Sequence, residues 1–244
     1  MQATRIEPQL TDSAAAVPLL QLTGVEQRYG AFRPVLAGLD LELRRGEFLL
    51  LEGAGGSGKS ALLRLMAGLE RPAAGTVRVA GEDLARLGTA SRAQMRRSIG
   101  YLPPGGGLLL SRTVLDNVAL APWAAGADRA EGIRRARVAL TLVGLDAERT
   151  AQTACSHLPS GERQCVALAR ALVNRPALLL LDDLLAPFDT PSAARILQLL
   201  GPFSESGVTI VVAQRCAAPS SLPLPPPWPA RARLLRLQDG LACS

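Results

Sequence analysis

The chain has 244 residues, of which 48% are hydrophobic and 20% are charged, so it can bury the core of one large domain or two small ones. Its formal net charge of +6 suits a polyphosphate ligand, a nucleic acid or an anionic membrane surface. The arginines are scattered and aromatic residues make up only 3%, which argues against a base-stacking surface, and we expect no nucleic-acid partner.

The N-terminal residues 1–18 are expected to form a flexible tail. They carry Glu7 and Asp12 and lack a continuous apolar core, which is typical neither of a signal peptide nor of a membrane span. Four cysteines form no C-x-x-C pair and His157 is the only histidine, so we expect reduced thiols and no zinc site. Because the longest apolar run is too short to cross a bilayer, any membrane role needs a partner.

Elements before residue 103 alternate between strands and helices. Apolar residues at every second position predict antiparallel strands, and unbroken apolar runs predict buried ones. The predicted strands are 20–29, 35–43, 47–52, 76–80 and 99–102, and the predicted helices are 60–67 and 91–97.

Beyond the glycine-rich turn 103–107 the composition becomes helical. Helices are predicted at 113–121, 129–143, 162–173 and 192–200, the last with Thr190 as its cap and Pro191 in its first turn. Buried strands are predicted at 177–183 and 208–213, an extended proline-rich segment at 219–229, and a last strand at 231–237. The pattern predicts an α/β fold, with a mostly parallel sheet between helices and an antiparallel part. We expect one domain over 19–243, with a helical subdomain at about 105–173.

The stretch from Gly53 to Ser60 reads G-x-x-x-x-G-K-S between a predicted strand and a predicted helix, which is the pattern of a phosphate-binding loop. Glycines let backbone N–H groups approach phosphate oxygens, Lys59 reaches the terminal phosphates, and the Ser60 hydroxyl holds Mg²⁺. Lys59 is the only lysine among 27 basic residues, which favours this function over a glycine-rich turn with a solvated lysine. The expected contacts of ATP are Gly53, Gly55, Gly56, Ser57, Gly58, Lys59, Ser60 and Ala61.

Two acids end the apolar strand predicted at 177–183. Asp182 is placed to hold Mg²⁺, and Asp183 is placed to orient an attacking water. The alternative is a pair of acids that cap a strand end and face solvent.

From 20 to 241 the chain resembles the ATP-binding subunits of ABC transporters. Tyr29 stands where that family has an aromatic residue that stacks on adenine, although a packing role at a strand end is the alternative. Residues 158–164, with Ser160 and Gly161, resemble the family signature, and 187–189, ending in Asp189, resemble its D-loop. The resemblance implies a P-loop NTPase of ABC type that binds ATP and Mg²⁺. It also implies a head-to-tail homodimer or heterodimer in which one signature covers the ATP of the other subunit.

Within the family, the residue runs 96–100, 111–119, 169–177 and 233–240 resemble the bacterial cell-division subfamily FtsE. Subunits for lipoprotein release and macrolide export are similar. The resemblance implies a cell-division role, an FtsX-like integral membrane permease as partner, and a peripheral location on the cytoplasmic side of the inner (plasma) membrane.

Four positions depart from the family pattern. Pro104 replaces a glutamine, and Pro159 replaces the signature serine. Asp183 replaces the catalytic glutamate, and Arg215 replaces the switch histidine. Asp183 and Arg215 are nevertheless the residues we expect to act on the γ-phosphate. Two functions stay open. The first is a slow ATPase, and the second is a hydrolysis-deficient nucleotide-binding switch or the degenerate half of a heterodimeric ABC transporter.

Overall fold

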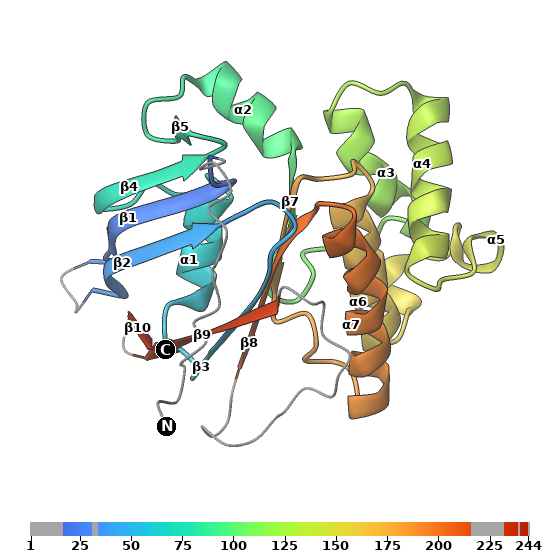
Figure 1. Cartoon of the computed structure of the whole chain (residues 1–244). Helices are drawn as coiled ribbons and strands as arrows, with labels where there is room; N and C mark the ends of the chain where they lie inside the picture. Colours follow the sequence, from blue (N-terminus) through green and yellow to red (C-terminus); the bar gives the residue numbers. More distant parts are fainter. Residues whose placement is uncertain (1–16, 31–33, 216–231, 239, 244) are drawn as a thin grey trace, which may run out of the picture.

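The computed structural model describes residues 17–30, 34–215, 232–238 and 240–243 (Figure 1). Nearly all of the predicted tail at 1–18 and the whole proline-rich segment at 219–229 lie outside the described residues. The fold is the α/β architecture expected from the sequence, with one antiparallel sheet, one mostly parallel sheet and flanking helices.

The smaller sheet has four strands in the order β2-β1-β4-β5, all antiparallel. Its alternation is clearest in β2, where Leu39, Leu41 and Leu43 are buried while Asp40 and Glu42 are exposed. This is the period of two that predicted the first two strands. The short β5 was not predicted. The strand bounds are β1 Leu20–Gln27, β2 Leu36–Leu43, β4 Ala74–Val79 and β5 Glu82–Asp83.

The larger sheet has six strands in the order β10-β9-β3-β8-β7-β6, and only the β9–β10 pair is antiparallel. The sequence predicted every strand except β10, which closes a hairpin on β9. The bounds are β3 Phe48–Gly53, β6 Ile99–Leu102, β7 Leu178–Asp182, β8 Thr209–Arg215, β9 Ala232–Gln238 and β10 Leu241–Cys243. The carboxyl ends of β3, β7 and β8 therefore meet at one edge, where ligands bind in open α/β sheets.

Two hydrophobic cores lie on opposite faces of the parallel sheet. Leu49 and Leu51 pack with helix α1 (Lys59–Met66) and the antiparallel sheet. Phe48 and Leu50, which point the other way, pack with α6 (Ser160–Leu172) and α7 (Thr190–Glu205). Figure 1 shows α1 on one side of the sheet and α6 with α7 on the other. Because β3 is buried on both faces, it reads as a continuous apolar run.

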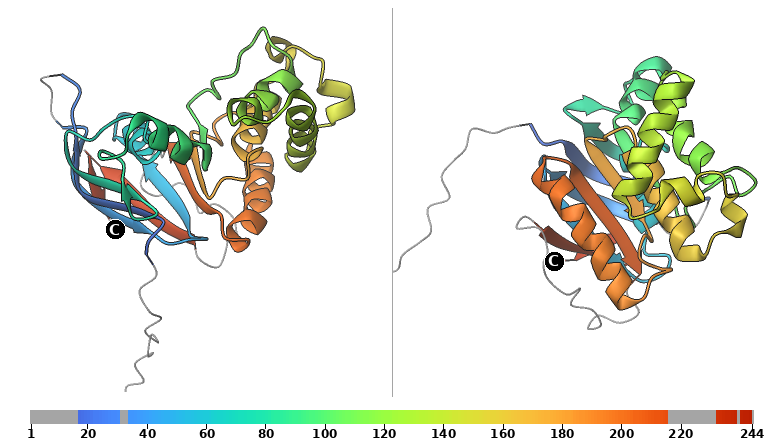
Figure 2. Two further views of the ribbon diagram at one scale, coloured as in Figure 1. Left: turned by 90° about the horizontal axis from the view of Figure 1, so that it is seen from above. Right: turned by 90° about the vertical axis from the view of Figure 1, so that its right-hand side faces the viewer.

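A helical block stands to one side of both sheets (Figure 2). It contains helices that begin at side-chain caps: the Thr113 hydroxyl accepts from the Asp116 N–H at 3.0 Å, and Asp128 accepts from the Glu131 N–H at 2.8 Å. Its elements are α3 Val114–Ala124, α4 Arg129–Leu142, α5 Ala147–Thr150 and a 3₁₀ turn at Cys155–His157; the short α2, Thr89–Arg97, lies before it in the chain. Among the described residues, no helix is both long enough and apolar enough to cross a bilayer.

The start and end of α7 differ from the prediction. Asp189, not Thr190, caps the helix, because the Asp189 carboxylate accepts from the Ser192 N–H at 2.9 Å. The helix also continues through Pro202 to Glu205 instead of ending at Leu200. Tertiary contacts explain this: Leu200 and Ser204 are buried, and the Ser204 hydroxyl donates to the Gly46 carbonyl at 2.8 Å. These contacts offset the hydrogen bond that a proline removes.

Gly100 in β6 allows a close approach of α6, which provides a test of the packing. A Cβ at Gly100 would lie 2.3 Å from the Ala171 carbonyl oxygen and 2.8 Å from Leu179 Cδ1. We expect Gly100→Ala to lower the free energy of unfolding by about 1–3 kcal/mol, measured by urea denaturation. Gly88→Ala is the control, since a Cβ there meets nothing within 4 Å. Equal stability of the two variants would contradict this packing.

Candidate nucleotide-binding site

The predicted phosphate-binding loop joins the end of β3 to the start of α1. Gly56 and Gly58 have φ of 80° and 101°, in the left-handed region where a side chain is strained. A Cβ at Gly58 would also lie 2.6 Å from the Val35 carbonyl oxygen. The loop therefore needs glycine for its turn and for its contact with the antiparallel sheet.

The loop is packed at its base and open in its middle. A Cβ at Gly53 would lie 2.5 Å from both the Leu237 carbonyl oxygen and the Ser57 hydroxyl oxygen, whereas one at Gly55 or Gly56 would meet nothing within 4 Å. A rigid base with an open backbone surface at a helix N-terminus is the geometry that receives an anion.

Lys59 is buried and lies against its own loop. Its Nζ donates to the carbonyl oxygens of Gly53 and Ala54, at 2.7 and 2.8 Å, and to the Ser57 hydroxyl at 3.0 Å. The next residues, Ser60 and buried Ala61, form the first turn of α1. The ammonium is thus held inside the loop, where it places a positive charge beside the open backbone of Gly55 and Gly56.

Asp182 lies at the carboxyl end of β7 and is buried. Burial raises the pKa of its carboxyl group; a hydrogen bond from Ser60 opposes this rise, and the nearby charge of Asp183 adds to it. Its Oδ2 atom has no hydrogen-bond partner among the described residues. A buried carboxylate oxygen without a partner, beside a serine hydroxyl, fits a hard cation such as Mg²⁺. Ser60 and Asp182 would hold it, as the sequence predicted.

Asp183 and Arg215 come together at the same edge. Asp183 has φ of 56°, a strained value for a residue other than glycine, and its N–H donates to the Ala213 carbonyl at 2.8 Å. Its Oδ2 forms an ion pair with Arg215 Nε at 3.5 Å, although the Arg215 side chain is 73% exposed. Sequence reasoning missed Gln164, whose buried side chain donates to the carbonyls of Asp183 and Leu184, at 3.4 and 3.2 Å. Nothing in its local pattern indicated that contact.

Tyr29 lies just after β1, within a polar cluster. Its hydroxyl donates to Glu70 and accepts from Arg64 Nη2 at 2.8 Å, and the Arg64 guanidinium lies 5.9 Å from the centre of its ring. Arg64 Nε also donates to Glu70 at 2.5 Å. Although burial opposes it, these hydrogen bonds hold the pKa of Glu70 below its usual value. The position of the Tyr29 ring is therefore fixed by the hydrogen bonds of its hydroxyl and by the Arg64 guanidinium beside it.

The remaining predicted site residues lie on the other face of the sheet. Ser160 and Gly161 begin α6, where a Cβ at Gly161 would lie 3.3 Å from the Phe188 ring. Asp189 is occupied as the N-cap of α7, and hydrogen bonds from the Ser192 side chain and from the Ser192 backbone N–H lower the pKa of its carboxyl group. Because α1 and α6 pack on opposite faces, one chain by itself places these residues and the phosphate-binding loop in different environments.

Pro104 is exposed in the turn that follows β6. The next three residues, Gly105 to Gly107, all have positive φ. Arg170 of α6 donates to the carbonyls of Gly106 and Gly107, at 2.5 and 2.9 Å. This turn is thus held from α6 through its backbone, and Pro104 has no side-chain donor or acceptor to offer a ligand.

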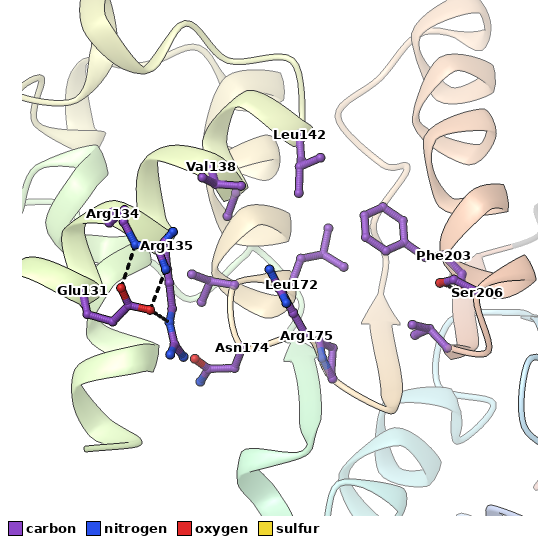
Figure 3. Close-up of a pocket in the computed structure, with 14 residues that line it drawn as sticks. Glu131, Arg134, Arg135, Val138, Leu142, Leu172, Asn174, Arg175, Phe203 and Ser206 are labelled. Atoms are coloured by element: carbon purple, nitrogen blue, oxygen red, sulfur yellow. Dashed lines mark hydrogen bonds and ion pairs between the residues drawn. The ribbon is translucent and has the colours of Figure 1, made fainter. Parts of the chain in front are cut away.

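A separate groove lies between α4 and the end of α7 (Figure 3). Glu131 pairs with Arg134 and Arg135 on one side, and Phe203 lies on the other. Asn174 to Pro176, which precede β7, also line the groove, so the groove lies near the amino end of β7. Asp182 marks the opposite end, and the groove is therefore not part of the nucleotide site.

Comparison with known proteins decides the family. A model described as ABC transporter matches residues 36–186, which include the phosphate-binding loop, the signature-like residues and Asp182. The chain belongs to the ABC transporter family. Proteins of this family bind ATP, generally with Mg²⁺, which agrees with the geometry at Lys59, Ser60 and Asp182.

Two relatives with different functions have about the same sequence identity to this chain. The cell division ATP-binding protein FtsE of Escherichia coli K12 is 38% identical over 80% of this chain and 87% of its own length. The methionine import ATP-binding protein MetN of Mesorhizobium japonicum is 39% identical over 81% of this chain. The chain spans only 54% of that relative, a little more than half.

Solved structures show the same fold. A dimeric post-hydrolysis structure of the ATP-binding cassette MJ0796, bound to ADP and Pi, has a TM-score of 0.80 and 29% identity, covering 91% of this chain and 96% of that one. Its fold agreement extends over both sheets and the helical block, since nearly all of the chain is covered.

Replacing Asp182 tests its metal role, because the substitution should weaken Mg²⁺-dependent binding and raise the thermal stability of the free protein. In Asp182→Asn, we expect Mg²⁺ no longer to strengthen ATP binding, because the anionic ligand is lost. We also expect a higher thermal midpoint without nucleotide at pH 7, since the raised pKa means that the folded state disfavours the charged carboxylate. In the wild type this penalty appears as pH rises through the folded pKa and disappears at lower pH. Calorimetric titration and thermal unfolding measure the two effects; unchanged Mg²⁺ dependence would contradict the metal role.

Proposed function

We propose that this protein is the ATP-binding subunit of an ABC-type membrane complex, and that it couples ATP binding, with slow hydrolysis, to a transmembrane partner. Two features of the same site support the proposal most strongly: the buried ammonium of Lys59, and the Asp182 carboxylate oxygen that lies beside Ser60 without a hydrogen-bond partner among the described residues. Together they supply a cation for the phosphates and a ligand for Mg²⁺.

A dimer completes the site in this proposal. Ser160 and Gly161 begin α6, and Asp189 caps α7; both helices pack on the opposite face of the sheet from α1, and Ser160 and Asp189 are exposed. A second ATP-binding subunit, arranged head to tail, brings its own copies of these residues over the bound ATP. The second subunit is either a second copy of this chain or a related chain.

The membrane partner is an integral permease subunit. The similarity to FtsE, which is matched over most of its length, favours an FtsX-like permease and a role in cell division. The protein then lies on the cytoplasmic side of the plasma membrane and is held there through its partner. The similar identity of MetN makes a transport complex the second candidate.

Hydrolysis depends on Asp183 and Arg215. Asp183 is one methylene shorter than the glutamate of the family, and its carboxylate is paired with Arg215. A displacement of about 1 Å in the group that orients water costs on the order of a hundredfold in rate. The same two features favour the alternative function, a switch that binds ATP and dimerises without useful turnover.

Removal of the loop cation tests nucleotide binding and turnover together. We expect Lys59→Ala to abolish both Mg²⁺-dependent ATP binding and phosphate release, because no other lysine can replace the ammonium. Binding is measured by calorimetry and turnover by phosphate release, with and without the permease. ATP binding by the wild type without turnover in either setting would support the switch instead of the ATPase.

Lengthening the acid at 183 tests which group limits the rate. We expect Asp183→Glu to raise phosphate release by about tenfold or more, because the carboxylate then reaches the position from which it orients water. Asp116→Glu, which adds the same methylene in the helical block, is the matched control and leaves the rate unchanged. No increase in Asp183→Glu would show that Asp183 does not limit the chemistry.

A further inference from the structure

The cluster around Tyr29 is built from three separated parts of the chain. Tyr29 follows β1, Arg64 belongs to the second turn of α1, and Glu70 follows that helix. Gln27, at the end of β1, adds to it: its Nε2 donates to Glu70 at 3.1 Å, and its Oε1 accepts from the Ala73 N–H at 3.2 Å. The carboxylate of Glu70 thus receives hydrogen bonds from three side chains.

This arrangement restricts the Tyr29 ring. The hydroxyl has both a donor and an acceptor partner, which fixes the outer edge of the ring. The Arg64 guanidinium lies over the ring at 5.9 Å from its centre. Yet the Tyr29 side chain is 42% exposed, so part of its surface remains open to a ligand. A flat, fixed and partly open aromatic surface loses little conformational entropy when a planar base stacks on it.

The position of Arg64 relates this ring to the phosphate-binding loop. Arg64 lies four residues after Ser60 in α1, on the same side of the helix. The same rigid helix therefore sets the places of the phosphate end and of the aromatic surface.

We infer that Arg64 and Glu70 are positioning residues that hold the Tyr29 ring to receive the purine base of the nucleotide. This inference rests on the proposed function, because it concerns the same nucleotide. It assigns the two residues to base recognition instead of to a surface ion pair, which would contribute little by itself.

The experiment compares ATP with inorganic tripolyphosphate, which has the same phosphate chain without a base. Tyr29→Phe keeps the ring and removes its hydroxyl, and Glu70→Ala removes the carboxylate that anchors it. In each variant we expect the affinity for ATP to fall roughly three- to tenfold. The ratio of the affinity for ATP to the affinity for tripolyphosphate should fall as well. The double variant should be no weaker than the weaker single one, because both substitutions remove one interaction.

Glu131→Ala is the matched control, since Glu131 also pairs with two arginines, at 2.7 and 2.6 Å, but lies on α4. It should bind ATP as the wild type does. Thermal unfolding without ligand identifies any variant that fails to fold, and Tyr29→Phe retains the packing of the ring.

Three results would overturn the inference. Equal losses for ATP and tripolyphosphate would show that the cluster only supports the loop. Unchanged or tighter ATP binding would show that Arg64 covers the surface a base needs. A wild type that binds neither compound would contradict the proposed function itself, and the inference with it.

Discussion

The structure of the site depends on one constraint: a buried ammonium and a buried carboxylate have to coexist at the carboxyl edge of the parallel sheet. Lys59 and Asp182 come from different elements; burial raises the pKa of Asp182, and the positive charge of Lys59 is one of the smaller effects that oppose this rise. Each charge is costly in a low-dielectric interior unless it is paired or bound. A Mg²⁺–polyphosphate ligand would place phosphate near Lys59 and supply a cation to the Asp182 oxygen that has no hydrogen-bond partner among the described residues. The Gly53 carbonyl helps to hold Lys59 in place, while Gly55 and Gly56 leave the middle of the loop open.

The two-sided sheet explains why the site is divided. Residues of β3 alternate between the core that contains α1 and the core that contains α6 and α7. The phosphate-binding loop leads into α1, which packs in the first core, and the signature-like residues lead into α6, which packs in the second. This division of the site agrees with the proposed dimer, in which a second subunit would close the site over the nucleotide. The ion pair between Asp183 and Arg215 lies at the carboxyl ends of β7 and β8, and Arg170 of α6 holds the turn that contains Pro104.

Sequence patterns predicted the parts of the site that are local in the chain. The strand, loop and helix around Gly53 to Ser60 follow from glycine spacing and hydrophobic periodicity, and Asp182 follows from the apolar run before it. The anchoring of Tyr29 could not be predicted, because Glu70 lies 41 residues away and the contact depends on how α1 packs on the antiparallel sheet. The extension of α7 through Pro202 was missed for the same reason: burial of Leu200 and Ser204 outweighs the local preference of proline. The observed cap of α7, Asp189, lies one residue before the predicted cap, Thr190, because both Asp and Thr are good helix caps.

In the proposed function the protein holds a Mg²⁺–nucleoside triphosphate by its phosphate chain. The most direct measurement is equilibrium binding of ATP, ADP and AMP to the wild type, each with and without Mg²⁺. We expect one binding site per chain, an affinity that falls from ATP to AMP, and a requirement for Mg²⁺ that is strongest for ATP. Equal affinity for ATP and AMP, or ATP binding that is indifferent to Mg²⁺, would contradict it.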